Sequence, residues 1–337
     1  MRSQCALYVD AGYLLASAAA RVSGTSLRSG VRIQNKALID GLIKQAEAES
    51  GLPVLRVNWY DSAVSPSGAL DTTQDAIGML PRVKLRLGRM SPGGVQKGVD
   101  VRIGLDIATH GRNRVVDVMY LVSGDDDLTE AVEEAQGHGV QVIVLAAPDA
   151  EGNAHAVSRN LQREADGLLV IDPLTIDTAV TRRLTPVVTL AAPETTPEVE
   201  VATHAPSPAD LAKLRRVPLP ASPAPSATHV WTSISGVPTG GGTWDHPAAE
   251  EKLSAELLAA IGAVCDRVAA SWLRTATPQE QLEARAERPY VPAEPDSALL
   301  TDLSSVLETY YIDDATRRAL REHFWIAVDK RTAQVGS

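Results

Sequence analysis

Short apolar runs alternate with helical patterns over the first half of this 337-residue chain. The runs CALYV, VDVMYLV, VQVIVL and LLVI have the apolar content of strands that are covered on both faces. Strands are expected at 6–9, 54–60, 83–87, 116–122, 140–145 and 168–171, and helices at 13–21, 35–48, 99–110, 128–137 and 154–165. Strands that alternate with helices in this way predict a doubly wound α/β domain around a central parallel sheet.

Proline marks the end of this domain. Residues 173–248 hold 12 of the chain's 21 prolines and a glycine triplet at 240–242. Such a segment buries too little apolar surface to offset the entropy lost on ordering, so we expect a disordered linker there. Helical spacing returns afterwards, as in Leu253, Leu257 and Ile261. The chain is therefore expected to contain an α/β domain at 1–172, a linker at 173–248 and a small helical module at 249–337.

Composition excludes several classes of protein. Two cysteines, Cys5 and Cys265, are too few for a disulfide framework or a zinc site. No apolar run approaches the roughly 18 residues of a membrane span, so we expect a cytoplasmic protein without a membrane partner. The net charge of −10 argues against nucleic-acid binding through bulk positive charge and leaves only a local basic patch for that role.

Carboxylates follow two of the expected strands and begin one helix. Asp10 ends the first strand, Asp125 to Asp127 follow the strand VMYLV, and Asp100 lies where a helix should begin. Ligands of an open parallel sheet bind outside the carboxyl ends of its strands, where Asp10 and the Asp125–Asp127 group are expected. Converging carboxylates repel one another, and a hard cation such as Mg²⁺ or Mn²⁺ relieves that repulsion. Each of these residues alone is equally well explained as a helix cap or a dipole partner.

These segments resemble the NYN domain family, the LabA-like branch of the PIN-like nucleases. The matching features are VDAGY with Asp10, KGVD ending at Asp100, SGDxD-L from Ser123, and the closing helix and strand around Ser158. The similarity covers about residues 4–172. It implies a three-layer PIN-like fold and metal-dependent RNA cleavage. One position departs from the pattern, because many relatives have Asn where this chain has Tyr13.

The resemblance implies a site made of Asp10, Asp100, Asp125 and Asp127, which would hold the metal and act in catalysis. In such a site the metal activates a water for in-line attack on phosphorus. Asp106, Ser123 and Ser158 are candidates to support the ligating carboxylates from behind, although packing or capping roles suit the two serines equally well. Asp126 is left out of this set because adjacent side chains point apart.

A short basic segment could attract the RNA backbone. Arg82, Lys84 and Arg86 alternate with apolar residues, which would place them on one face of a strand, and Arg89 and Lys97 follow. Phosphate contacts along this track would position RNA without reading its bases. A solvated edge strand, protected from aggregation by its charges, is the equally supported alternative.

Two other function classes remain beside the ribonuclease. A non-catalytic NYN-type scaffold would bind RNA or protein through the same surface, but it has no need to crowd four carboxylates. Other phosphotransfer enzymes fit less well. A haloacid-dehalogenase-like site needs Asp where this chain has Gly12, and a toprim-like site needs Glu where it has Asp10. The helical module is expected to recruit RNA or a protein partner, or to self-associate.

Overall fold

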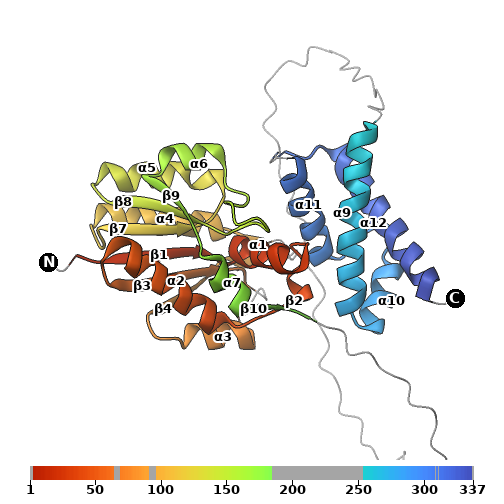
Figure 1. Cartoon of the computed structure of the whole chain (residues 1–337), viewed down its shortest axis with the longest axis horizontal. Helices are drawn as coiled ribbons and strands as arrows, with labels where there is room; N and C mark the ends of the chain where they lie inside the picture. The colour runs from red at the N-terminus through yellow and green to blue at the C-terminus, as the bar shows by residue number, and fades with distance from the viewer. Residues whose placement is uncertain are drawn as a thin grey trace, which may run out of the picture. The chain divides into compact units, whose positions relative to one another are not determined.

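The computed structural model describes residues 3–63, 69–90, 96–183, 253–307, 309 and 311–335, with the backbone alone at 89–90, 96–97 and 335. A parallel six-stranded sheet forms the centre of the first part (Figure 1). Its order is β4 (Val83–Leu87), β3 (Val54–Asp61), β1 (Cys5–Asp10), β7 (Val118–Val122), β8 (Gln141–Ala146) and β9 (Gly167–Val170). All six strands expected from the apolar runs therefore form, and they make one sheet.

Helices cover both faces of this sheet. One face packs against α1 (Ala11–Ser23), α2 (Asn35–Ser50) and α7 (Pro173–Ala179), and the other against α4 (Val99–Arg112), α5 (Thr129–Gly137) and α6 (Arg159–Glu164). Strand β1 lies between β3 and β7. Its side chains alternate between the two faces of the sheet, so Leu7 packs in the core under α1 and α2, and Tyr8 packs in the core under α4. The three-layer α/β fold is confirmed.

The helix expected at 154–165 is shorter in the structure. Ala156 has a positive φ of 49°, and Pro148 forms an isolated bridge with Ala154, so the chain before 158 follows a turn. The Ser158 hydroxyl then accepts from the Leu161 N–H and caps α6. A side-chain cap of this kind fixes where a helix begins.

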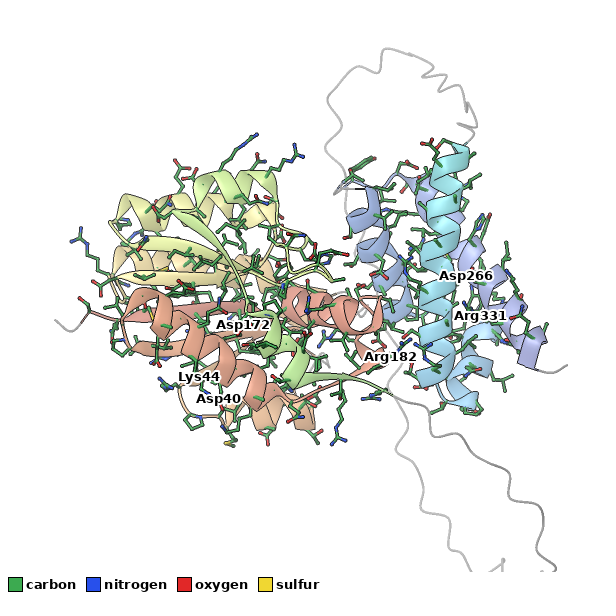
Figure 2. All side chains as sticks on the ribbon, viewed as in Figure 1. Asp40, Lys44, Asp172, Arg182, Asp266 and Arg331 are labelled. Carbon is green, nitrogen blue, oxygen red and sulfur yellow. The ribbon has the colours of Figure 1, made fainter. Side chains whose placement is uncertain are left out.

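Several short elements lack any periodic signal in the sequence. They are η1 (Arg28–Gly30), β2 (Val31–Ile33), α3 (Thr72–Gly78), β5 (Arg89–Met90), β6 (Gln96–Lys97), η2 (Asp126–Leu128) and β10 (Val180–Arg182). Strand β10 pairs antiparallel with β2, and Asp172 caps α7 just before it (Figure 2). The described α/β part thus continues beyond residue 172 to Arg183. The rest of the expected linker, residues 184–248, lies outside the described residues.

Four helices make up the described residues of the C-terminal part: α9 (Ala255–Thr275), α10 (Pro278–Ala286), α11 (Ala293–Leu307) and α12 (Asp314–Val335). Ser254 and Thr277 cap α9 and α10, and Trp272, Phe324 and Trp325 form a tilted aromatic cluster in the core between α9 and α12. Arg331 of α12 lies 3.8 Å from Asp266 of α9, Nε to Oδ1 (Figure 2). The expected helical module is therefore present. No helix of the described ranges has both the length and the apolar character to cross a membrane.

Candidate active site

Asp10 lies where β1 passes into α1. Its Oδ1 accepts the Tyr13 N–H at 3.2 Å, so it caps the helix as well as ending the strand. Burial, followed by the negative charges of Asp100 and Asp125, raises the pKa of Asp10 to about 6 despite the hydrogen bonds from Tyr13 and Gly12. A carboxylate that is costly to ionise at the end of a central strand is typical of a functional site.

Asp100 comes from the first turn of α4, which starts after Gly98 in a left-handed conformation with φ 81°. Burial and then the charges of Asp125 and Asp127 raise its pKa. Asp100 and Asp10 line the same cavity of about 240 Å³, together with Gly12, Asp61, Ser62, Gly98 and Val99. Two carboxylates that are 90 residues apart in the chain therefore meet at the carboxyl end of the sheet.

Asp125 and Asp127 follow β7 at the same edge. Asp125 Oδ1 accepts the Asp127 N–H at 3.1 Å and so begins the short helix η2. The fully buried hydroxyl of Ser123 accepts the Asp125 N–H at 3.3 Å. Ser123 thus holds the backbone of the acidic turn, while Asp125 and Asp127 act on Asp100 through their charge.

The side chain of Asp126 points to the opposite side of this turn, away from Asp125 and Asp127. Its carboxylate accepts hydrogen bonds from the Ser158 hydroxyl and from Asn160 Nδ2, the latter at 3.2 Å. Ser158 consequently contacts Asp126 and caps α6, and its hydroxyl bonds to none of the four carboxylates proposed for the site. The separation of adjacent side chains anticipated from the sequence is seen here.

Asp106 belongs to a different polar group, between α4 and the sheet. Its Oδ2 accepts from the Tyr60 hydroxyl at 2.9 Å and lies 3.1 Å from Arg86 Nε. One helical turn onward, His110 Nδ1 lies 2.8 Å from the Tyr8 hydroxyl. Asp106 is therefore engaged by Tyr60 and Arg86, and it is not among the described residues that line the cavity of Asp10 and Asp100.

The basic residues of the expected track separate in space. Arg82 precedes β4 in a left-handed conformation and pairs with Glu47 of α2 at 2.9 Å, whereas Arg86 pairs with Asp106 of α4. These helices cover opposite faces of the sheet. Lys84 lies between Arg82 and Arg86 in the sequence, and its side chain is exposed. Arg89 and Lys97 are opposite each other in the β5–β6 pair, and their side chains lie outside the described part of the structure.

Asp61 is a residue of this cavity that the sequence patterns did not indicate. It ends β3, next to the end of β1, where Tyr60 is paired with Asp10. Its Oδ1 accepts the Ser62 N–H at 2.8 Å, and its Oδ2 accepts Nε2 of the buried Gln74 at 3.1 Å. The strand-end position that identified Asp10 applies equally to Asp61, and placing the end of the strand at residue 60 concealed it.

The chemistry of the site fits a hard divalent cation. The side chains contribute carboxylate oxygens, and positive charge there would offset the repulsion that raises the pKa values of Asp10 and Asp100. Within the described residues, no three His, Cys, Asp or Glu side chains are arranged closely enough to hold a metal. Binding would therefore require these carboxylates to turn toward a shared point.

Two residues shape the loops around the site. A Cβ on Gly124 would lie 1.8 Å from the carbonyl oxygen of Ala156, so a side chain cannot be accommodated without moving the backbone. Tyr13, at the position that departs from the family pattern, donates its hydroxyl to the His155 carbonyl at 2.7 Å and accepts the Ala147 N–H at 3.1 Å. Its side chain thus braces the β8 end rather than pointing a polar group at Asp10.

Comparison with known proteins supplies a family for this architecture. The family model of the NYN domain matches residues 6–172. The uncharacterized protein y4oD of Sinorhizobium fredii is 37% identical over 108 residues, which are 32% of this chain and 49% of that protein. The chain thus aligns with about half the length of this curated relative.

Two solved structures are also similar. A protein of unknown function from Vibrio parahaemolyticus has 22% identity and a TM-score of 0.36, covering 51% of this chain and 94% of its own. An isochorismatase-like hydrolase from Alkaliphilus metalliredigens has 11% identity and a TM-score of 0.24, covering 52% and 94%. Both TM-scores are below 0.5, so neither likeness bears on the function.

Proposed function

Since residues 6–172 belong to the NYN domain family, a PIN-like nuclease fold, we propose that this chain is a metal-dependent ribonuclease that hydrolyses RNA phosphodiester bonds. Its site is the group of Asp10, Asp100, Asp125 and Asp127 at the carboxyl edge of the sheet. The observation that carries the proposal is that Asp10 and Asp100 line one cavity while burial and neighbouring carboxylates raise the pKa of both.

The four carboxylates would hold one or more Mg²⁺ or Mn²⁺ ions. A cation in that place supplies Lewis-acid chemistry, which polarises the phosphoryl group and makes a neighbouring water more acidic. The chain itself positions the ligands: Tyr13 N–H fixes Asp10, the start of α4 presents Asp100, and Ser123 secures the turn that carries Asp125. Preorganised ligands reduce the reorganisation needed when substrate arrives.

RNA is the proposed partner, held by its phosphates. Lys84 is an exposed cation of the basic segment, and Arg82, Arg86, Arg89 and Lys97 complete the proposed contact set. Arg82 and Arg86 would have to exchange their present carboxylate partners for phosphate. A cytoplasmic location is part of the same proposal, as the compartment in which RNA is available to the protein.

The test uses the full chain on labelled single-stranded and structured RNA with Mg²⁺, Mn²⁺ or EDTA. We expect cleavage that requires metal and is lost in Asp10→Asn and Asp125→Asn. Asp126→Asn is the matched control, because Asp126 faces Ser158 and Asn160 and should be dispensable. Cleavage that persists in Asp10→Asn and Asp125→Asn would refute the assignment of the site. RNA binding without cleavage in any metal would favour the non-catalytic scaffold.

A further inference from the structure

The segment Thr25–Gly30, between α1 and β2, makes the contacts from which this inference is drawn. We call residues 25–30 the docking segment. Its central residue, Leu27, has no exposed surface and belongs to the same apolar cluster as Leu299 of α11 and Phe324 of α12. The core of the C-terminal helices is therefore completed by a leucine that lies more than 220 residues before α9 begins.

Hydrogen bonds surround this leucine. The Ser26 N–H donates to Asp302 Oδ1 at 2.9 Å, and the Ser26 hydroxyl lies 3.4 Å from the Ala298 carbonyl oxygen, both on α11. The Ser29 N–H donates to Glu294 Oε1 at 2.7 Å. The Ser26 and Ser29 N–H groups are thus satisfied by carboxylates of one helix, which fixes both the position and the orientation of the docking segment.

Asp302 is difficult to explain without this contact. Its side chain is only 7% exposed, and burial raises its pKa. A carboxyl group buried in a helical module is costly unless hydrogen bonds compensate it, and the described bonds come from the docking segment. The position of an acid in the core of α11 therefore indicates that the module is built to accept these N–H groups.

Small residues allow the close approach on the other side. A Cβ on Gly30 would lie 2.6 Å from the hydroxyl oxygen of Ser271 in α9, and the Ser29 and Thr275 hydroxyls lie 3.4 Å apart. Residues 1–185 and 251–337 accordingly group into one compact unit. Apolar burial, oriented hydrogen bonds and close packing are the features that distinguish a specific interface from an incidental contact.

We propose that the C-terminal helices are a built-in protein partner of the NYN domain, docked on residues 25–30 by contacts that persist without the covalent connection through 184–252. The docking segment directly follows α1, the helix that Asp10 caps, so the partner is anchored at the far end of the helix that begins at the proposed site. This proposal concerns assembly and stands whether or not the site cleaves RNA.

The experiment inserts a specific protease recognition sequence between residues 220 and 221 of the full chain. After cleavage, size-exclusion chromatography and native mass spectrometry report whether the two fragments stay together. We expect a 1:1 complex of the fragments, and complete separation when the chain also carries Leu27→Asp. Leu174→Asp is the matched control, because Leu174 is 67% exposed on α7, and its fragments should remain associated.

A second variant protects the test against misfolding of Leu27→Asp. Glu294 is exposed, so Glu294→Ala should leave both parts folded, as checked by circular dichroism. Because the substitution removes the acceptor of the Ser29 N–H, we expect a higher dissociation constant for the complex of the two fragments. Separation of the unsubstituted fragments would overturn the proposal. So would a complex that Leu27→Asp and Glu294→Ala leave unchanged, or an assembly containing two copies of each fragment, which would place the contact between chains.

Discussion

The hydroxyl of Tyr13 donates a 2.7 Å hydrogen bond to the carbonyl oxygen of His155, 142 residues later in the chain. The oxygen of the Tyr13 hydroxyl also accepts the Ala147 N–H at 3.1 Å. Tyr13 therefore ties the first turn of α1 to the segment that follows β8. The backbone N–H of Tyr13 meanwhile holds Asp10, so one residue supports two neighbouring loops of the proposed site by different groups.

Tyr13→Phe separates these two contributions. The substitution removes the hydroxyl from two partly buried backbone partners, so we expect the free energy of unfolding, measured by urea denaturation, to fall by about 1–3 kcal/mol. The Tyr13 N–H contact to Asp10 persists in Phe, so the rate of RNA cleavage below the unfolding transition should change little. Loss of cleavage without loss of stability would show instead that the hydroxyl takes part in the chemistry.

Asp10→Asn should make the metal-free protein more stable at neutral pH. The pKa of Asp10 is about 6 when folded and near 3.8 when unfolded, so the folded state binds more protons between these values. The stability conferred by the protonated carboxyl is complete below about pH 4 and is lost as the pH rises through 6. Asn cannot ionise, yet it retains an oxygen for the Tyr13 N–H.

Urea denaturation in EDTA at a series of pH values from 4 to 8 measures this effect. We expect Asp10→Asn to gain on the order of 2 kcal/mol over the unsubstituted chain at pH 7.5, and little at pH 4. Asp126→Asn, whose carboxylate lies on the other side of the turn, should show no such gain. A loss of stability in Asp10→Asn at pH 7.5 would contradict the buried, unfavourable charge.

Mg²⁺ titrations of cleavage test whether Asp61 belongs to the site. Asp61 lines the cavity with Asp10 and Asp100, so Asp61→Asn removes a negative charge that attracts the cation. We expect the Mg²⁺ concentration for half-maximal cleavage to rise about tenfold, equivalent to about 1.4 kcal/mol of binding free energy. Asp75→Asn changes an exposed acid of α3 and should leave the titration unchanged. An identical shift in both variants would indicate a general effect of net charge.

The salt dependence of RNA affinity distinguishes the basic residues of β4. Lys84 is exposed, so Lys84→Ala should remove one phosphate contact and reduce the slope of log affinity against log salt by about 0.7. Arg86→Ala removes a proposed phosphate contact as well, and because it leaves Asp106 without its cation we expect an added loss of about 1–3 kcal/mol in unfolding free energy. An unchanged slope in Arg86→Ala would restrict Arg86 to its structural role beside Asp106 and contradict its place among the proposed RNA contacts.

The sequence indicated the sheet well and the polar contacts less well, for physical reasons. Buried parallel strands such as Val118–Val122 are apolar throughout, and that signal is local. Strand β2 has three residues and depends on its pairing with β10, about 150 residues later, which no local pattern reveals. The partner of Arg86 depends on how α4 packs over β4, so alternation along the strand could not reveal its contact with Asp106, nor the pairing of Arg82 with Glu47 of α2.

Strand ends explain why the sequence indicated Asp10 for the proposed site and did not indicate Asp61. Asp10, Asp100, Asp125 and Asp127 are recognisable because each stands next to a strand or helix boundary within a motif. Asp61 has the same kind of position, but it belongs to no motif, and its fixation by Gln74 arises from α3, which the sequence patterns did not predict. Knowledge of the tertiary arrangement was needed to place it beside Asp10.

Gly124 of the SGD motif has a structural role that is separate from the role of Asp125 after it. Because the Ala156 carbonyl occupies the space where a side chain would begin, the path of the backbone requires glycine here, independently of the proposed reaction. A homologous chain that had lost hydrolysis would still be selected to keep this glycine as long as it folds. Surveys that separate active from degenerate members of such proteins should therefore score the carboxylates independently of the glycine.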